Sequence, residues 1–193
     1  MGRQEIVHRL QESARVRKMM SETLVDDITR VADIIAQAIK SETHQVLLFG
    51  VGGSAAICEE ISQDLKGFYR ASSGTILVYP LTTETGFLTQ ILNDHSAEEI
   101  FSWQIETSGK KGDIAIAIST SGDSPSVIRA ARVGRDLGLT VIALTGKTGG
   151  KLAEYSQENT IKVPSLDTVH IEDAFLTIGH IICQEIRDRL SQR

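Results

Sequence analysis

Short apolar runs alternate along most of the chain with longer segments in which apolar residues recur at helical spacing. Five runs rich in β-branched residues end at Gly, Pro or a hydroxyl-bearing residue, which is typical of buried β-strands. The segments between and after the runs predict a helix ending near residue 66, helical structure within 84–108, and helices at 125–137 and 171–190. The predicted strands cover residues 46–49, 75–79, 113–118, 140–144 and 160–163.

The order of these elements predicts the fold class. Strands alternate with helices, and the runs at 113–118 and 140–144 are apolar on both faces, as in parallel strands with helices on both sides. With right-handed crossovers this arrangement becomes a doubly wound α/β sandwich. Ligands of such sheets bind beyond the carboxyl ends of the strands. The loops at 50–54, 119–124 and 145–150 are therefore the candidate site.

The N-terminal segment has a different texture. Residues 3–42 contain no Gly or Pro, and their apolar spacing predicts two helices joined near Ser21. The first helix would carry a stripe of Ile6, Leu10 and Ala14, which must be buried on this domain or on another subunit. We predict a single domain over 1–193, with a helical arm at 1–42 and an α/β sandwich at 43–193.

Composition and charge exclude several classes of protein. The chain has 193 residues and a formal net charge of −5, without the basic block that grips a nucleic-acid backbone. No apolar run is long enough to span a membrane, and the charged N-terminus lacks a signal-peptide core. Cys58 and Cys183 belong to no CxxC pair, and we expect both as small buried residues in a reducing compartment. We predict a cytoplasmic protein that binds neither membranes nor nucleic acid directly.

Residues 119–124, here called the serine loop, lie between a predicted buried strand and a helix that opens at Pro125. Turn formation and helix capping by Ser124 account for part of this sequence. They do not account for the further hydroxyls of Ser119, Thr120 and Ser121. Hydroxyls and free amides at a helix N-terminus bind phosphate without a lysine. We therefore favour a phosphate site over a simple cap.

Residues 50–54, here called the glycine loop, also follow a strand and open a helix. With the residue after them they match G-x-G-x-x-A, the fingerprint of dinucleotide-binding domains, which is weak alone. Such a domain also needs an acid at the end of the second strand, where this chain has Tyr79-Pro80. The nearest acid is Glu84, so a phosphate monoester is favoured over NAD. A P-loop motif is absent, which excludes a P-loop nucleotidase.

Acidic residues and one histidine are the candidates for chemistry. Glu60 and Asp64 are four residues apart, so they share a helix face that begins at the glycine loop. The alternative is a solvated acidic face. His180 lies in an apolar stretch, where a histidine is often a core residue. Glu172 precedes it by eight residues, about 12 Å along a helix. Both reach one site only if they approach from its two ends or come from different subunits.

Four motifs together resemble the sugar isomerase (SIS) domain, most closely that of bacterial phosphoheptose isomerases. They are Gly-x-Gly-Gly-Ser at 50–54, Asn93-Asp94, the serine loop, and Leu-Thr-Gly-Lys-x-Gly-Gly at 144–150. The resemblance implies a flavodoxin-like five-stranded sheet and a homotetramer with active sites between subunits. It also implies interconversion of sedoheptulose 7-phosphate and glycero-manno-heptose 7-phosphate, the first step towards the heptose of lipopolysaccharide.

The resemblance assigns roles to the acids and the histidine. The family has Glu, its proposed base, at the position of Asp64, and His, Gln and His at the positions of Glu60, Glu172 and His180. In some members these four positions hold zinc. This chain keeps only His180 unchanged, and Val51 replaces the usual Asn of the glycine loop. An Asp is one methylene shorter than a Glu, which matters where an error near 1 Å costs about a hundredfold in rate.

The sequence therefore predicts a phosphosugar aldose–ketose isomerase that works through an enediol and requires no cofactor. Asp64 would take the proton next to the carbonyl, and His180 would move protons on the opposite side. The alternatives are a non-catalytic SIS tetramer that binds a phosphosugar or a protein partner as a regulator, and an NAD-binding module. A divalent metal, zinc by resemblance, would bind Glu60, Asp64, Glu172 and His180. The substrate would contact Gly52, Gly53, Ser54, Asp94, Ser119, Thr120, Ser121, Ser124 and Glu172.

Overall fold

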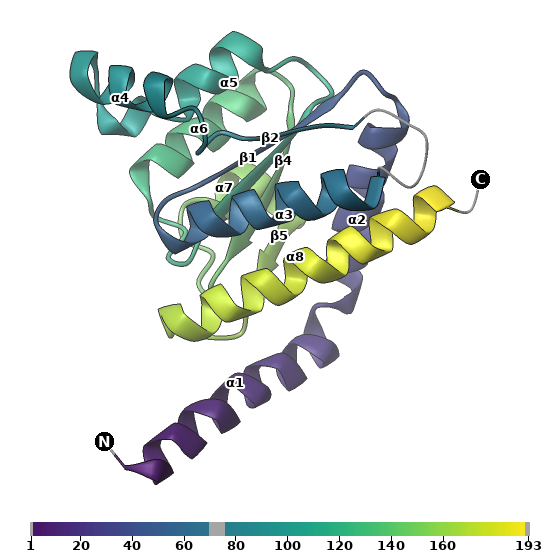
Figure 1. The fold of residues 1–193 in the computed structure, drawn as a ribbon, viewed down its shortest axis with the longest axis vertical. Coiled ribbons are helices and arrows are strands. Elements are labelled where there is room, and N and C mark those ends of the chain that lie inside the picture. The colour runs from purple at the N-terminus through teal and green to yellow at the C-terminus, as the bar shows by residue number, and fades with distance from the viewer. Residues whose placement is uncertain (1, 70–75, 192–193) are drawn as a thin grey trace.

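The computed structural model describes residues 2–69 and 76–191. Its centre is a parallel sheet of five strands in the order β2-β1-β3-β4-β5 (Figure 1). This is the strand order of flavodoxin-like sheets, so the predicted fold class is confirmed. The strands are β1 (Gln45–Gly50), β2 (Leu77–Pro80), β3 (Ile114–Ser119), β4 (Thr140–Thr145) and β5 (Thr160–Lys162).

Helices cover both faces of the sheet. On one face α2 (Val25–Lys40), α3 (Gly53–Tyr69) and α8 (Thr168–Ser191) bury a large apolar cluster. On the other face α5 (Ser102–Ser108) and α6 (Pro125–Asp136) bury a second cluster. Successive residues of β3 belong to opposite clusters, which explains why its sequence is apolar throughout. Besides the N-terminal α1, the described residues also form α4 (Thr85–Asp94), α7 (Ala153–Ser156) and the 3-10 turns η2 (Ala97–Glu99) and η3 (Gln157–Asn159).

The N-terminal arm consists of two helices, as predicted. They meet at Leu24, because α1 (Arg3–Thr23) ends there and α2 begins at Val25. The arm is held to α8 by Ser13 and Arg17, which both bond the carboxylate of Asp173. The predicted stripe of α1 is not buried within the described chain, since Ile6 is 59% and Leu10 68% exposed. Figure 1 shows α1 extending away from the sandwich.

Element boundaries shift by a few residues for local reasons. The strand predicted from Thr75 begins at Leu77, and Thr75 itself lies outside the described residues. Pro80 ends β2 as its last residue, because β2 is an edge strand and an edge tolerates the missing amide. The last helix begins at Thr168 instead of 171, since the carboxylate of Asp167 accepts a hydrogen bond from the amide of Val169 at 2.9 Å.

Both cysteines are free thiols buried in the core, as predicted. Burial raises the pKa of Cys58 far above its ordinary value and that of Cys183 to about 12, so neither thiol is a nucleophile at neutral pH. Within the described ranges no helix is long and apolar enough to cross a membrane.

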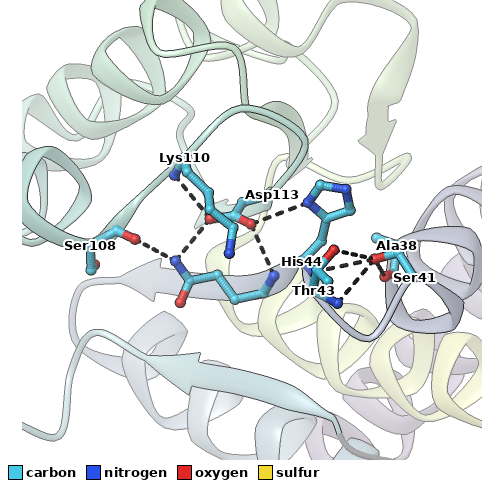
Figure 2. Close-up of polar contacts among 8 residues, drawn as sticks. Ala38, Ser41, Thr43, His44, Ser108, Lys110 and Asp113 are labelled. Carbon is cyan, nitrogen blue, oxygen red and sulfur yellow. Dashed lines mark hydrogen bonds and ion pairs between the residues drawn. The ribbon is translucent and has the colours of Figure 1, made fainter.

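A polar cluster lies at the amino ends of β1 and β3, opposite the edge where the candidate loops lie (Figure 2). Its centre is Asp113, whose side chain is fully buried. The carboxylate accepts hydrogen bonds from the amide and side chain of Gln45, at 3.0 and 2.8 Å, and from the amide of Lys110 at 3.0 Å. The Nδ1 of His44 is 3.6 Å from the same carboxylate, too far for a hydrogen bond. The cluster ties together the segments that lead into the two strands.

Candidate active site

The serine loop connects β3 to α6 at the carboxyl edge of the sheet. Ser119 ends β3, and its hydroxyl lies 3.0 Å from that of Ser124 and accepts a hydrogen bond from the amide of Gly122 at 3.2 Å. Pro125 is the first residue of α6, as predicted. Ser124 occupies the capping position, but its side chain caps no amide of the helix. Helix capping therefore does not explain the hydroxyls of this loop.

The serine loop is packed against residues 146–152, which follow β4. The amide of Gly146 donates to the carbonyl of Thr120 at 3.0 Å, and the amide of Leu152 donates to that of Gly122 at 2.9 Å. Gly122 has a φ of 72°, and a Cβ there would collide with the carbonyl of Gly149. The two segments are thus packed together as one unit at the carboxyl edge of the sheet.

A cavity of about 220 Å³ lies between these loops and the start of α8. Two of the predicted phosphate ligands, Thr120 and Ser121, line it. The sequence did not point to the other polar residues of this wall, although Lys147 belongs to the Leu-Thr-Gly-Lys-x-Gly-Gly motif. Its place directly after β4 and Gly146 was the signal that could have found it. These unassigned residues are Asp123, Lys147, Thr148, Ser165 and Thr168.

The glycine loop brings the N-terminus of α3 close to the same edge. Gly52 has a φ of 64°, a conformation that favours glycine, and Ser54 is buried in the first turn of the helix. The carboxylate of Glu172 lies against Gly53, and a Cβ at that position would collide with its Oε1. A carboxylate is favourable beside a helix N-terminus because of the helix dipole. Glu172 therefore faces the glycine loop from α8.

Helices α3 and α8 run side by side in the same direction (Figure 1). They approach closely at Gly179, where a Cβ would lie 2.6 Å from Cγ1 of Ile61. One residue later, Nε2 of His180 lies 3.6 Å from Oδ2 of Asp64 and 3.8 Å from Oε1 of Glu60. The side chain of His180 is 43% exposed, which excludes the alternative of a core histidine. The two helices thus bring these three groups together.

Two predicted residues lie apart from this group. Glu172 and His180 are separated by about 12 Å along α8, and each faces a different part of α3. Asp94 ends α4, is exposed, and accepts a hydrogen bond from the side chain of Asn93 at 2.6 Å. Within one chain, Glu172 therefore does not meet the other three proposed metal ligands, which are Glu60, Asp64 and His180.

The positions of the acids and of His180 also decide whether one chain could bind a metal ion. Among the residues that the structure describes, no group of three or more His, Cys, Asp or Glu side chains is arranged to hold a metal ion. The separation along α8 also leaves the Glu172 carboxylate at Gly53, away from His180, so Glu172 does not join Glu60 and Asp64 beside that imidazole. The donor set of one chain does not fit the metal that the sequence resemblance implied.

Comparison with known proteins places the chain beside one family. Residues 10–146 match the SIS domain. The phosphoheptose isomerase of Aquifex aeolicus (strain VF5) is 41% identical over 182 residues, which are 94% of each chain. The phosphoheptose isomerase of Aliarcobacter butzleri (strain RM4018) is 39% identical over 170 residues, covering 88% of this chain and 89% of the relative.

Solved structures give the same likeness. A phosphoheptose isomerase from Neisseria gonorrhoeae superposes with a TM-score of 0.87 at 30% identity, covering 95% of this chain and 97% of that one. A phosphoheptose isomerase from Francisella tularensis superposes with a TM-score of 0.89 at 26% identity, covering 96% and 98%. The similarity thus includes the helical arm and the last helix as well as the sheet.

Proposed function

This chain belongs to the phosphoheptose isomerase family of SIS domain proteins, and we infer that it is an isomerase. We propose that it is an aldose–ketose isomerase that interconverts sedoheptulose 7-phosphate and glycero-manno-heptose 7-phosphate. The observation that carries this is the 41% identity to a phosphoheptose isomerase over 94% of both chains. It favours an isomerase over a non-catalytic scaffold and over an NAD-binding module.

The phosphate of the sugar would bind at the serine loop. Ser119, Thr120, Ser121 and Ser124 supply hydroxyls, and the first amides of α6 add the partial positive charge of a helix N-terminus. Ser54 would reach the same phosphate from the glycine loop, with Gly52 and Gly53 allowing close approach of the backbone. The packing of the serine loop against residues 146–152 supports this role, because a preformed site loses little entropy on binding.

The proton transfers would take place between α3 and α8. Starting from the open-chain ketose, Asp64 removes the proton on C1, and His180 protonates the C2 oxygen, which gives the enediol. Asp64 then returns a proton to C2 while His180 accepts the proton of the C1 hydroxyl, which leaves the aldehyde. The 3.6 Å between Oδ2 of Asp64 and Nε2 of His180 supports this pairing, but within one chain the two groups would approach the substrate from the same side and not from the opposite sides expected from the sequence. Glu60 would orient hydroxyls there, as Glu172 would at the glycine loop and Asp94 at the end of α4.

We further propose a homotetramer with a composite active site. The apolar residues of α1 support it, since Ile6 and Leu10 are exposed in the single chain. The 12 Å between Glu172 and His180 supports it as well, because two subunits can supply to one substrate what one helix cannot. Light scattering at micromolar concentration tests this. A monomer with full activity would contradict both the tetramer and the shared site.

We propose that the reaction takes place in the cytoplasm and needs no metal. Two buried free thiols are consistent with a reducing compartment. Proton transfer through an enediol balances with one base and one acid, so no step requires a cation. A divalent ion bound between subunits is the alternative, and elemental analysis of protein purified without chelator tests it. Stoichiometric metal whose removal by chelator abolishes activity would overturn the metal-free mechanism.

One experiment tests the function directly. The protein is incubated in deuterated water with ketose phosphates of five to seven carbons, and isomerisation is followed by NMR. We expect net conversion of sedoheptulose 7-phosphate and incorporation of deuterium at the carbon next to the carbonyl. Deuterium exchange reports the enediol even where turnover is slow. A protein that binds the sugar phosphate but exchanges no proton would support the regulatory scaffold instead.

A further inference from the structure

Lys147 is an unpaired cation beside the serine loop. It lines the cavity of about 220 Å³ together with Thr120 and Ser121. It also lines a larger cavity of about 600 Å³ between α1 and the start of α8. The residue is exposed, and within the described part of the chain its ammonium makes no hydrogen bond and no ion pair. Its charge is therefore available to a ligand at the boundary between the two cavities.

The backbone holds Lys147 in a fixed place relative to the loop. Its amide donates to the carbonyl of Ser165 at 3.0 Å, and the amide before it, that of Gly146, donates to Thr120. A Cβ at Gly146 would lie 2.7 Å from the carbonyl of Thr120 and from Cδ1 of Ile171. Only a glycine lets β4 end this close to the serine loop. The lysine stem therefore begins directly beside the predicted phosphate ligands.

The charge of a phosphate monoester is not balanced by the serine loop alone. Such a phosphate carries between one and two negative charges at neutral pH, since its second pKa is about 6. Residues 119–124 contribute hydroxyls and amides but no cationic side chain. In the wall of the smaller cavity, all of whose residues are described, Lys147 is the one cation and Asp123 the one acid. Asp123 is already engaged, because its Oδ1 accepts a hydrogen bond from the amide of Lys151 at 3.0 Å.

We propose that Lys147 is a substrate-binding residue, whose ammonium pairs with the phosphate held by the serine loop and selects phosphorylated over neutral sugars. A lysine suits this role as a mobile point charge that follows the phosphate. The inference rests on the proposed function, because it assigns this lysine to the phosphate of the isomerase substrate. It adds a charged contact to a site that otherwise depends on hydroxyls and a helix dipole.

The test compares three variants by kinetics and by binding. Lys147→Met removes the charge and keeps the length of the side chain, whereas Lys147→Arg keeps the charge. Lys151→Met is the matched control, since Lys151 is exposed on the same segment and lines neither of the two cavities. The substrate is sedoheptulose 7-phosphate, and inorganic phosphate is the competitive probe.

We expect Lys147→Met to raise the KM and the inhibition constant of inorganic phosphate by about tenfold or more, the usual effect of losing a charged hydrogen bond. The kcat should stay within about threefold, because a contact made equally in ground and transition states changes KM alone. Raising the salt concentration should weaken binding by the parent more than by the variant. Lys147→Arg should retain most of the affinity, and Lys151→Met should match the parent.

The inference is overturned if Lys147→Met binds inorganic phosphate and sugar phosphate as the parent does, or if only kcat falls. A change of the same size in Lys151→Met would also overturn it, since the effect would then be one of general surface charge. A parent that binds inorganic phosphate but turns over no sugar phosphate separates the two proposals. In that case the isomerase fails, while the binding measurements still decide the role of Lys147.

Discussion

The molecule contains two Asp–His pairs with the same separation and opposite surroundings. His44 Nδ1 lies 3.6 Å from Asp113 at the amino edge of the sheet, and His180 Nε2 lies 3.6 Å from Asp64 between α3 and α8. Asp113 is fully buried and accepts three hydrogen bonds (Figure 2). Asp64 is 21% exposed, and its neighbour is the exposed imidazole of His180. The distance between the partners therefore does not distinguish the two pairs.

The two Asp–His pairs differ in the hydrogen bonds that each carboxylate accepts. The oxygens of Asp113 accept hydrogen bonds from the backbone amides of Gln45 and Lys110. A proton or ligand at this carboxylate would compete with those bonds and destabilise the segments that lead into β1 and β3. Within the described residues Asp64 accepts no such bonds from backbone amides, so it can accept a proton without disturbing the core. A catalytic base must be able to change its protonation state while the fold stays intact. We therefore propose that the exposed pair serves catalysis and that the buried pair serves stability.

The largest effect is expected from Asp64→Asn. The amide keeps the size of the side chain but cannot accept the proton, so kcat should fall by about 10²–10⁴. The melting temperature should change little, because in the part of the chain that the structure describes this carboxylate makes no hydrogen bond to the backbone. Steady-state kinetics and thermal unfolding measure the two quantities. Glu59→Gln is the control on the same helix, since Glu59 bonds Thr82 and does not contact His180. Equal loss in both variants would contradict the role of Asp64.

Asp113→Ala should show the reverse behaviour. It leaves the amide and side chain of Gln45 and the amide of Lys110 without their acceptor. An unsatisfied buried donor costs about 1–3 kcal/mol, so the free energy of unfolding should fall by roughly 3 kcal/mol or more. The KM of the folded fraction should stay at the parent value. Denaturant unfolding measures the loss, and Asp136→Ala at the exposed end of α6 is the control. A stable variant with impaired catalysis would reverse our assignment of the two pairs.

Much of the fold follows from the sequence, because apolar runs and the residues that end them are local signals. The strands and the burial of α2 were predictable in this way, whereas the exposure of Ile6 and Leu10 was not. The flavodoxin-like strand order was expected only from the family resemblance. A helical stripe specifies that a face is apolar but not which surface covers it. The sequence predicted Asp113 only as the first residue of a strand. Its role in the polar cluster could not be predicted, because its partner Gln45 is 68 residues away in the sequence.

The candidate site was predictable only in part. The serine loop and the glycine loop are contiguous motifs, and the structure places both at the carboxyl edge of the sheet. The approach of His180 to Asp64 depends on how α8 packs on α3, which no spacing within one helix reveals. The separation of Glu172 from His180 did follow from the rise of a helix, because geometry along one element is local.

A smaller effect is expected from the serine loop. Ser121→Ala and Ser124→Ala each remove one hydroxyl, and losing a hydrogen bond to a charged group should weaken phosphosugar binding by about 1.5–3 kcal/mol. Calorimetric titration with sedoheptulose 7-phosphate measures this. Stability should hold in Ser124→Ala, since Ser124 caps no amide of α6, and should fall only slightly in Ser121→Ala, which loses an exposed bond from the amide of Asp123. Ser96→Ala serves as the control, because this serine caps η2, away from the loop. Unchanged affinity in both variants would show that the loop only connects β3 to α6.

The smallest and most informative change is Asp64→Glu, which restores the residue that the family resemblance assigns to the base. The added methylene extends the carboxylate by about 1 Å, towards a histidine now 3.6 Å away, and a shift of that size is enough to alter the rate of proton transfer. The neighbouring Glu60 already lies 3.8 Å from the same imidazole, so the longer side chain must share its space. We expect kcat to fall by less than tenfold, short of the roughly hundredfold loss that a fixed error of about 1 Å causes, because the side chain at this position is partly exposed and a Glu can change rotamer to recover part of the shift. The double variant with Glu60→His, which supplies the family's second residue, should then recover the parent rate.

The opposite outcome is a kcat of Asp64→Glu alone that exceeds that of the parent. In that case the short side chain of Asp64 limits the rate of proton transfer, and Glu60 does not affect the position of the base. The ratio of the two kcat values decides between these outcomes, with thermal unfolding confirming that both variants are folded.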